Sequence, residues 1–184
     1  MNAMQHYFDE RLASAELIHS AETVAAAVTR VAGEITEKLA GADPLLLCVM
    51  SGGVPFAGHL MTQLQFPLEF DYLHVTRYGQ KTEGGELSWR ALPATPVAGR
   101  TVLVLDDILD EGTTLAAIVA RLQAMGVQAC YTAVATEKQL NGKKKPIRAD
   151  FVALTVPDRF VFGFGMDVSG HFRNLPAIYA MKAD

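Results

Sequence analysis

The sequence predicts an α/β fold in which a mainly parallel, twisted sheet is flanked by helices. Short apolar runs alternate with amphipathic helical patterns, and Gly, Pro and polar residues separate them. Strands that alternate with helices favour parallel pairing, because each helix returns the chain to the same end of the sheet. The 184 residues are 50% hydrophobic and 20% charged, which is an ordinary globular composition. We therefore expect one domain over residues 1–184, large enough to bury a core.

The first part of the chain predicts a helix, a strand and a second helix. Ser20 is a suitable N-cap for a helix over Ala21–Leu39, whose apolar residues recur at three- and four-residue spacing on one face. The continuous apolar run Leu45–Met50 is typical of a strand covered on both faces. Ser51-Gly52-Gly53 ends that strand, and the next helix is expected over Pro55–Gln65, with its proline in the first turn.

The middle of the chain predicts two strands joined by a loop. One strand is expected over Leu68–Thr76, and a short return strand over Leu87–Ala91. The polar stretch from Arg77 to Glu86 contains several glycines and has no apolar periodicity, so we expect a mobile loop there.

The second half predicts one more helix among three strands. Thr101–Leu105 is a strongly apolar strand that ends in acidic residues, and an amphipathic helix is expected over Thr113–Met125, with a glycine at its C-cap. Further strands are expected over Val127–Thr136 and Phe151–Val156. The polar stretch between these two strands contains the basic run Lys143–Lys145, which is typical of a solvated loop.

Composition disfavours several classes of function. The formal net charge of -4 gives no reason to expect binding to nucleic acid or to an anionic membrane. Met1–Arg11 lacks the apolar core of a signal peptide, and no apolar stretch approaches the length of a membrane span, so we expect a cytoplasmic protein. Cys48 and Cys130 lie in apolar runs and are expected to be inert core thiols.

Acidic and hydroxyl residues gather at the ends of predicted strands. Asp106, Ser51 and Thr76 each lie at the carboxyl end of a strand, where parallel sheets bind ligands. In the segment Val102–Thr114, a buried strand delivers two adjacent carboxylates, and a loop with Gly112 and two threonines then begins a helix. The start of a helix presents unpaired N–H groups and a positive dipole end, so this loop is suited to a phosphate.

This loop differs from two common phosphate motifs. The chain has neither the G-x-x-x-x-G-K-[ST] of a Walker A loop nor the G-x-G-x-x-G of a dinucleotide site. Carboxylates beside a phosphate repel it unless they face hydroxyl groups or a cation. A ribose phosphate meets both conditions, because its phosphate takes the loop while its hydroxyls or a Mg²⁺ ion face the acids.

The segment Val102–Thr114 resembles the phosphoribosyl diphosphate motif of the type I phosphoribosyltransferases. Two later segments resemble the hypoxanthine-guanine branch of that family. Pro157–Asp167 is similar to its purine-binding segment, and His171–Pro176 is similar to another stretch of the family. Glu137-Lys138 stands where the family carries a purine-contacting lysine. The resemblance covers nearly the whole chain, because three earlier segments also fit: Leu17-Ile18, Met50–Gly53 and Arg77–Gly79.

The resemblance implies a transfer of the 5-phosphoribosyl group from phosphoribosyl diphosphate to hypoxanthine or guanine, with Mg²⁺ as cofactor. It also implies a small hood built from about residues 1–20 and 157–184, a cis peptide bond at Met50-Ser51, and self-association as a dimer or tetramer. Side-chain chemistry agrees with an oxopurine, because the Lys138 ammonium can donate to a 6-oxo group and is a poor partner for the amino group of adenine. Phe160 offers a face for stacking on a flat base.

The resemblance assigns roles to individual residues. The phosphoribosyl group is expected to bind Asp106, Asp107, Glu111, Gly112, Thr113, Thr114 and Leu115. The diphosphate is expected at Ser51, Gly52, Gly53 and Arg173, and the flexible loop is expected to begin with Arg77, Tyr78 and Gly79. The purine is expected at Lys138, Phe160, Val161 and Asp167, with Asp110 as the general base. Mg²⁺ is expected at Asp106, Asp107 and Asp167.

Two departures from the family pattern leave the identity of the base open. Ser51 stands where many relatives carry a basic residue, and Asp106-Asp107 replaces the Glu-Asp pair that is more common in this branch. Xanthine also has a 6-oxo group for Lys138, so a xanthine-preferring enzyme is the first alternative. A nucleotide-sensing regulator on the same fold is the second, although it would need an added domain or a basic face, which the acidic balance disfavours.

Overall fold

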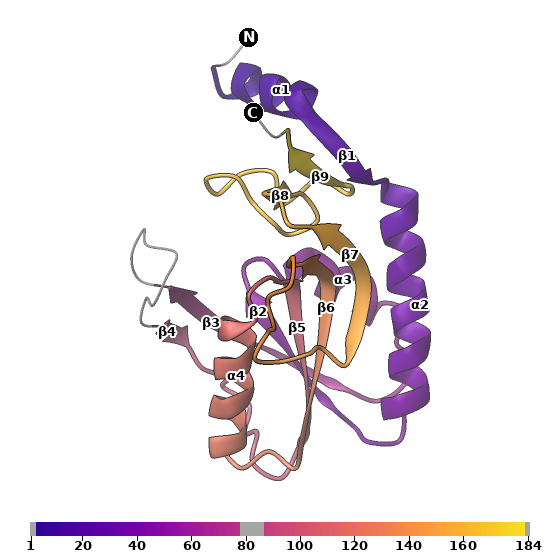
Figure 1. Cartoon of the computed structure of the whole chain (residues 1–184). Coiled ribbons are helices and arrows are strands. Elements are labelled where there is room, and N and C mark those ends of the chain that lie inside the picture. The colour runs from indigo at the N-terminus through magenta and orange to yellow at the C-terminus, as the bar shows by residue number, and fades with distance from the viewer. Residues whose placement is uncertain (1–2, 78–86, 183–184) are drawn as a thin grey trace.

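The computed structural model describes residues 3–77 and 87–182, and this part of the chain contains two sheets (Figure 1). The larger sheet forms the body of the molecule, and the smaller one lies above it, beside the N- and C-termini. The elements follow in the order α1 Ala3–Ser14, β1 Ala15–His19, α2 Ala21–Leu39, β2 Leu45–Met50, α3 Val54–Met61, β3 Glu69–Arg77, β4 Leu87–Ala91, β5 Thr101–Leu109, α4 Thr113–Ala124, β6 Ala129–Gln139, β7 Phe151–Pro157, β8 Val161–Phe162 and β9 Ile178–Met181.

The large sheet confirms the predicted fold class. Its strands lie in the order β4-β3-β2-β5-β6-β7. Within this order, the neighbouring strands β3, β2, β5, β6 and β7 pair in parallel. The short return strand β4 runs antiparallel to β3. The carboxyl ends of the parallel strands therefore meet at one edge of the sheet, where such sheets bind ligands.

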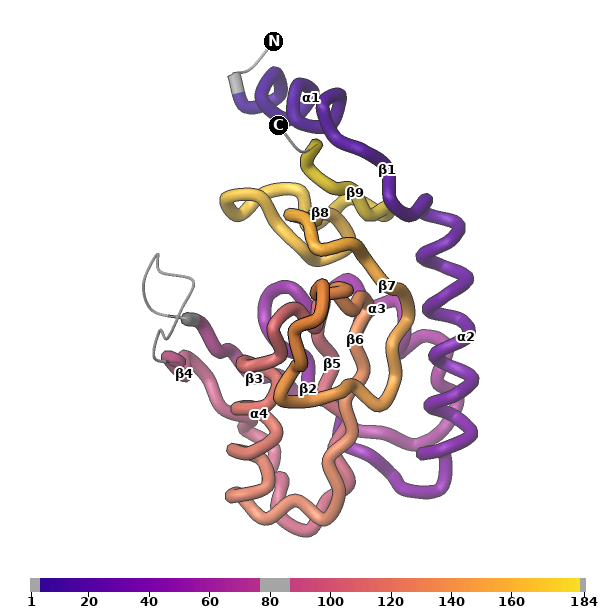
Figure 2. Tube along the Cα trace, in the orientation of Figure 1, coloured from indigo at the N-terminus to yellow at the C-terminus, as the bar shows by residue number. Residues whose placement is uncertain are grey.

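Both faces of the central strand β2 are covered, which explains its unbroken apolar sequence. Leu46 and Cys48 pack into a core layer shared with α2 and α3, while Leu45 and Leu47 pack into a second layer with α4. All four of these residues are at most 1% exposed. Figure 2 shows α2 along one side of the sheet and α4 along the other.

The bounds of α2, β2 and β4 are those predicted. Ser20 caps α2 as expected, since its Oγ accepts a hydrogen bond of 3.3 Å from the backbone N–H of Thr23. The helix α3 is shorter than predicted and ends at Met61. It ends there because the N–H groups of Gln63 and Leu64 bond to carbonyls three residues back, which turns the chain out of the helix.

The strand β5 is longer than predicted and continues to Leu109. Its pairing with β6 runs on through Ile108↔Thr136 and Leu109↔Glu137, so the ladder extends past the acidic residues. Asp106 and Asp107 thus lie inside a strand, where successive side chains point to opposite faces of the sheet.

The small sheet is built from segments near both ends of the chain, as expected for the hood. β9 lies between β1 and β8 and pairs antiparallel with each. Phe162 and Phe172 form its core, and Phe8 of α1 stacks on Phe172 with ring centroids 4.5 Å apart. The helix α1 was not predicted, because its mixed polar sequence lacks a clear apolar period.

The two cysteines differ from each other in burial. Cys48 is buried as predicted, whereas Cys130 near the start of β6 is only partly buried, which corrects the expectation of two core thiols. Burial raises the pKa of Cys48 to about 12 and that of Cys130 to about 11, so both thiols remain poor nucleophiles. None of the helices in the described residues combines the length and apolarity needed to cross a membrane.

Candidate active site

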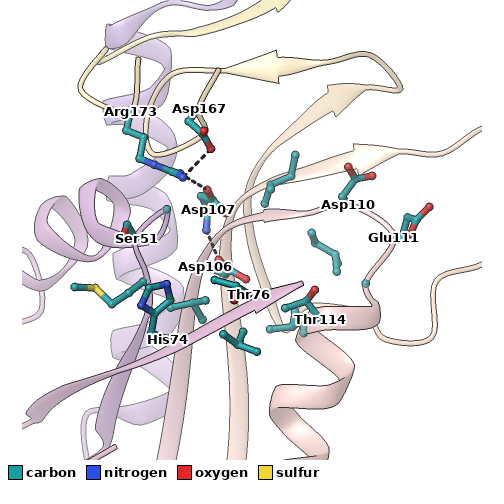
Figure 3. A pocket seen from close by; sticks show the side chains of 18 residues that line it. Ser51, His74, Thr76, Asp106, Asp107, Asp110, Glu111, Thr114, Asp167 and Arg173 are labelled. Carbon is teal, nitrogen blue, oxygen red and sulfur yellow. Dashed lines mark hydrogen bonds and ion pairs between the residues drawn. The ribbon is translucent and has the colours of Figure 1, made fainter. Parts of the chain in front are cut away.

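A pocket of about 710 Å³ opens at the carboxyl ends of β2, β3 and β5 (Figure 3). It brings together most of the residues that were predicted to hold a phosphoribosyl group and a diphosphate: Ser51, Gly52, Asp106, Asp107, Glu111, Gly112, Thr114, Leu115 and Arg173. Asp110, the predicted general base, and Asp167, predicted for the purine and Mg²⁺, line it too. Thr76 also lines the pocket, as its place at a strand end predicted. Among the residues that the structure describes in full, the other predicted site residues do not line it: Gly53, Thr113, Lys138, Phe160 and Val161.

Asp106 and Asp107 place two carboxylates in succession on β5. Asp106 is 8% exposed, and its Oδ1 accepts a hydrogen bond of 2.9 Å from the backbone N–H of Asp107. Burial raises the pKa of Asp106 well above its ordinary range, and the Asp107 carboxylate raises it further. Burial also raises the pKa of Asp107, against the lowering effects of its contact with Asp106 and of Arg173. Two acids in this environment favour a bound cation or sugar hydroxyls as partners.

Arg173 connects the hood to this carboxylate pair. Its Nη2 lies 2.7 Å from Oδ1 of Asp167, and its Nη1 lies 3.8 Å from Oδ2 of Asp107 (Figure 3). Nη1 also donates to the backbone carbonyl of Gly165. The guanidinium is therefore held between one carboxylate from the hood and one from β5, at the wall of the pocket.

Two glycines let the loop after β2 pass close to β5. A Cβ at Gly52 would overlap the Asp107 carboxylate, and a Cβ at Gly53 would lie 2.7 Å from a carbonyl oxygen of β5. Both glycines are buried, but only Gly52 lines the pocket. The peptide bond between Met50 and Ser51 is cis, as the resemblance implied. Ser51 is exposed and brings a hydroxyl group to the pocket.

The loop that begins with Glu111 leads into α4 at the pocket. Gly112 is the N-cap residue with φ of 83°, a conformation that glycine adopts because it has no Cβ. Its carbonyl accepts a hydrogen bond of 2.9 Å from the N–H of Ala116, which begins the helix. The positive dipole end of α4 thus lies at the pocket wall formed by Glu111, Gly112, Thr114 and Leu115, an arrangement suited to a phosphate.

Asp110 and Lys138, which were predicted to contact different atoms of a purine, are paired with each other. Nζ of Lys138 lies 2.6 Å from Oδ2 of Asp110. The Asp110 side chain is 45% exposed and lines the pocket, whereas the Lys138 side chain is 13% exposed. The pair therefore lies at the rim, with its carboxylate open to a ligand in the pocket.

The hood contributes a second hollow of about 690 Å³ next to the pocket, and Asp167 lines both. Phe160 lines the second hollow and is 55% exposed, while Val161 is buried. Tyr7 and Arg11 of α1 also line it. Sequence reasoning missed these two residues, because no motif marked the first helix.

The flexible loop that begins at Arg77 and the Mg²⁺ site were also predicted. Arg77 is the last residue of β3, and Tyr78 and Gly79 lie outside the described residues. In residues 3–77 and 87–182, no group of three or more His, Cys, Asp or Glu side chains is arranged to hold a metal by itself. Asp106 and Asp107 fit Mg²⁺ bound in the other common way, through one or two carboxylates together with oxygen atoms of a phosphate substrate.

The chain belongs to the phosphoribosyl transferase domain family, whose model matches residues 14–169. The matched range includes the acidic pair on β5, the glycine loop after it and the start of α4.

Its similarity to the hypoxanthine-guanine branch is equally extensive. The chain is 33% identical over 168 residues to the hypoxanthine-guanine phosphoribosyltransferase of Bacillus subtilis, which covers 91% of this chain and 93% of the relative. It is 31% identical over 170 residues to the enzyme of the same name from Streptococcus thermophilus, covering 92% and 94%. The predicted resemblance to this branch is confirmed.

Solved structures agree with the sequence relatives. A hypoxanthine phosphoribosyltransferase from Staphylococcus aureus superimposes with a TM-score of 0.86 at 27% identity, over 99% of this chain and 96% of that one. A hypoxanthine-guanine-xanthine phosphoribosyltransferase gives a TM-score of 0.83 at 27% identity, over 91% and 97%.

Proposed function

We propose that this protein transfers the 5-phosphoribosyl group from phosphoribosyl diphosphate to N9 of hypoxanthine or guanine, giving IMP or GMP and diphosphate. One observation carries the proposal: the Asp106–Asp107 pair, the glycine start of α4 and the carboxylate of the Asp110–Lys138 ion pair line one pocket. These groups suit, in turn, a ribose, its phosphate and an oxopurine. The named relatives, which cover more than nine-tenths of the chain, support the same reaction.

The phosphoribosyl diphosphate is proposed to lie across the pocket. Its 5′-phosphate binds the start of α4 at Glu111–Leu115, and its ribose hydroxyls face Asp106 and Asp107. Its diphosphate lies against the loop Ser51–Gly53, with the Arg173 guanidinium near by. Bond breaking at C1′ places positive charge on the ribose, and the carboxylates of β5 favour that charge.

Magnesium is the proposed cofactor, with Asp106 and Asp107 as its protein ligands and Asp167 near a second ion. When bound with the substrate, Mg²⁺ supplies positive charge that offsets the charge of the leaving diphosphate. Asp167 is already paired with Arg173 at 2.7 Å, so its place as a ligand requires that this pair be shared or broken.

The purine is proposed to meet the Asp110–Lys138 pair with its 6-oxo and N7 edge. Asp110 takes one of the three N–H donors of the Lys138 ammonium, so a 6-oxo group can accept another. Asp110 accepts the N7 proton as general base, and Phe160 stacks on the ring. The segment that begins at Arg77, Tyr78 and Gly79 is proposed to close over the diphosphate and exclude water.

We further propose that the protein is a purine-salvage enzyme of one domain that acts in the cytoplasm. We also propose that it associates with itself as a dimer or tetramer. Phe70 and Tyr72 are 47% and 45% exposed and point to the same face of β3, which supports a contact between copies at that strand. Sedimentation of the purified protein tests this part, and a monomer at all concentrations would contradict it.

A xanthine-preferring enzyme is the second candidate, and Arg11 favours it. Arg11 lines the hollow that Phe160 and Asp167 share, and the 2-oxo group of xanthine needs a hydrogen-bond donor such as a guanidinium group. One of the solved structures most like this chain carries xanthine in its name.

The decisive experiment is an assay with phosphoribosyl diphosphate, Mg²⁺ and four bases in parallel: hypoxanthine, guanine, xanthine and adenine. We expect turnover of the oxopurines and very little of adenine. Activity with none of the four would refute the enzyme, and a strong preference for xanthine would select the second candidate.

A further inference from the structure

Lys145 was expected in a solvated basic loop, but its ammonium group is enclosed. Its side chain is 10% exposed, whereas the two lysines before it are exposed. Nζ donates to Oε1 of Glu137 at 3.0 Å and to the backbone carbonyls of Leu109 at 3.0 Å and Lys138 at 2.6 Å. An ammonium has three N–H donors, so these three acceptors use all of them.

The two carbonyl groups that bind Lys145 adjoin the ion pair at the rim of the pocket. Leu109 directly precedes Asp110, and Lys138 is the partner of Asp110. In the described chain, the parallel pairing of β5 with β6 ends at Leu109↔Glu137. Lys145 therefore links the two strand ends at the point where the backbone ladder stops.

The residues after Lys145 support the same corner of the site. A Cβ at Gly112 would lie 3.4 Å from both Cδ of Pro146 and Cγ2 of Ile147, so these side chains pack directly behind the phosphate loop. Ile147 also packs against the core layer that contains α4. The loop segment 145–147 thus connects the strand ends to the hydrophobic core.

We propose that Lys145 is a positioning residue for base recognition. Its ammonium fixes the backbone at Leu109 and Lys138, so that the side chains of Asp110 and Lys138 present one geometry to the base. The inference rests on the proposed function and assigns Lys145 no contact with substrate. A displacement of about 1 Å at a reacting group can cost on the order of 10²-fold in rate, so a side chain behind the pair can control turnover.

Lys145→Met tests the proposal, because it keeps an unbranched apolar side chain and removes the charge and the donors. We expect the KM for hypoxanthine to rise and kcat to fall, with a loss in kcat/KM of about 10-fold to 10²-fold. The KM for phosphoribosyl diphosphate should stay within about twofold, since the phosphate loop keeps its own packing. Lys144→Met is the matched control, because it makes the same change at the exposed neighbouring lysine and should behave as wild type.

Two further variants separate positioning from folding. Lys145→Arg keeps the positive charge and N–H donors and should recover part of the lost kcat/KM. Glu137→Gln weakens one of the three acceptors and should cause a smaller change in the same KM. A purely structural role would lower the melting temperature and the amount of active enzyme with both KM values unchanged, and that result would overturn the proposal.

Amide hydrogen exchange of wild type and Lys145→Met gives a readout that does not depend on activity. Peptides that span residues 107–112 and 136–140 should exchange faster in the variant, and equal exchange would overturn the proposal. If wild type turns over none of the bases while exchange rises in the variant, the proposed enzyme fails but the anchoring by Lys145 is retained.

Discussion

The Asp110 carboxylate and the Lys138 ammonium are 2.6 Å apart across the ends of two neighbouring parallel strands. The acceptor and the donor that are proposed to bind an oxopurine edge are thus already paired with each other. A base that inserts at this pair finds both groups oriented, which reduces the reorganisation needed on binding. In the proposed complex each side chain faces a different atom of the base, so mutations can separate their contributions.

Asp110→Asn should lower kcat by about 10²-fold to 10⁴-fold, the usual range for loss of a general base. The amide keeps the size of the side chain but cannot take a proton from N7. Steady-state kinetics with hypoxanthine measure the effect, and the KM for phosphoribosyl diphosphate should change little. Turnover close to wild type would remove Asp110 from the proposed role.

Lys138→Ala should impair the use of hypoxanthine and guanine far more than the binding of phosphoribosyl diphosphate. The ammonium is proposed to contact the base alone, and its loss removes a charged hydrogen bond to the 6-oxo group. Titration calorimetry with each substrate makes the comparison, with Lys143→Ala as the exposed control. An equal loss for both substrates would argue against base recognition by Lys138.

Gly52→Ala should reduce both activity and thermal stability, because the new Cβ would displace the Asp107 carboxylate. We expect a loss in kcat/KM of about tenfold or more, as the displaced acid faces the ribose in the proposed complex. Gly58→Ala is the control within α3, where no atom lies within 4 Å of an added Cβ. That control should stabilise the protein by roughly 0.5–1 kcal/mol, since alanine is the better helix residue. Similar melting curves for both variants would contradict the close approach of Gly52 to Asp107.

The raised pKa of Asp106 predicts that Asp106→Asn increases thermal stability, by an amount that depends on pH. A raised pKa means that the folded chain binds this proton more tightly than the unfolded chain. The resulting stability is fully present below the ordinary value of 3.8 and is lost as pH rises through the pKa of the folded state. The variant, which cannot ionise, should therefore melt above wild type at about pH 8, and the difference should shrink near pH 4.

Thermal melts without Mg²⁺ or substrate measure this difference for Asp106. A constant offset between the two proteins across the pH range would mean that Asp106 ionises in the folded state as readily as in the unfolded one.

The periodic and apolar segments of the fold were predictable from sequence, because burial imposes their pattern. The bounds of α2 and β2 follow directly from side chains that face a core. The end of β5 could not be predicted, since the acidic residues suggest a strand end, whereas Asp106 is paired with β6 and the pairing continues to Leu109. The helix α1 likewise has no apolar pattern of its own and packs onto the hood through Phe8.

The candidate site was predictable wherever one short segment carries several groups. Val102–Thr114 supplies both the carboxylates and the loop that is proposed to bind phosphate, and the structure brings them to one pocket. Contacts between distant segments could not be predicted in this way. The burial of Lys145 depends on carbonyl groups of β5 and β6, and a basic run in the sequence gives no sign of them.

The pairing of β9 with both β1 and β8 has a consequence for the order in which the protein acquires its parts. Residues 178–181 follow the entire large sheet in the chain, so a growing polypeptide can complete the sheet and its acidic pair first. The small sheet gains its central strand β9 only afterwards. The backbone carbonyl of Phe160 accepts a hydrogen bond of 2.9 Å from the N–H of Met181 on that strand. During synthesis, the large sheet with Asp106 and Asp107 can therefore form before the small sheet that adjoins Phe160 is complete.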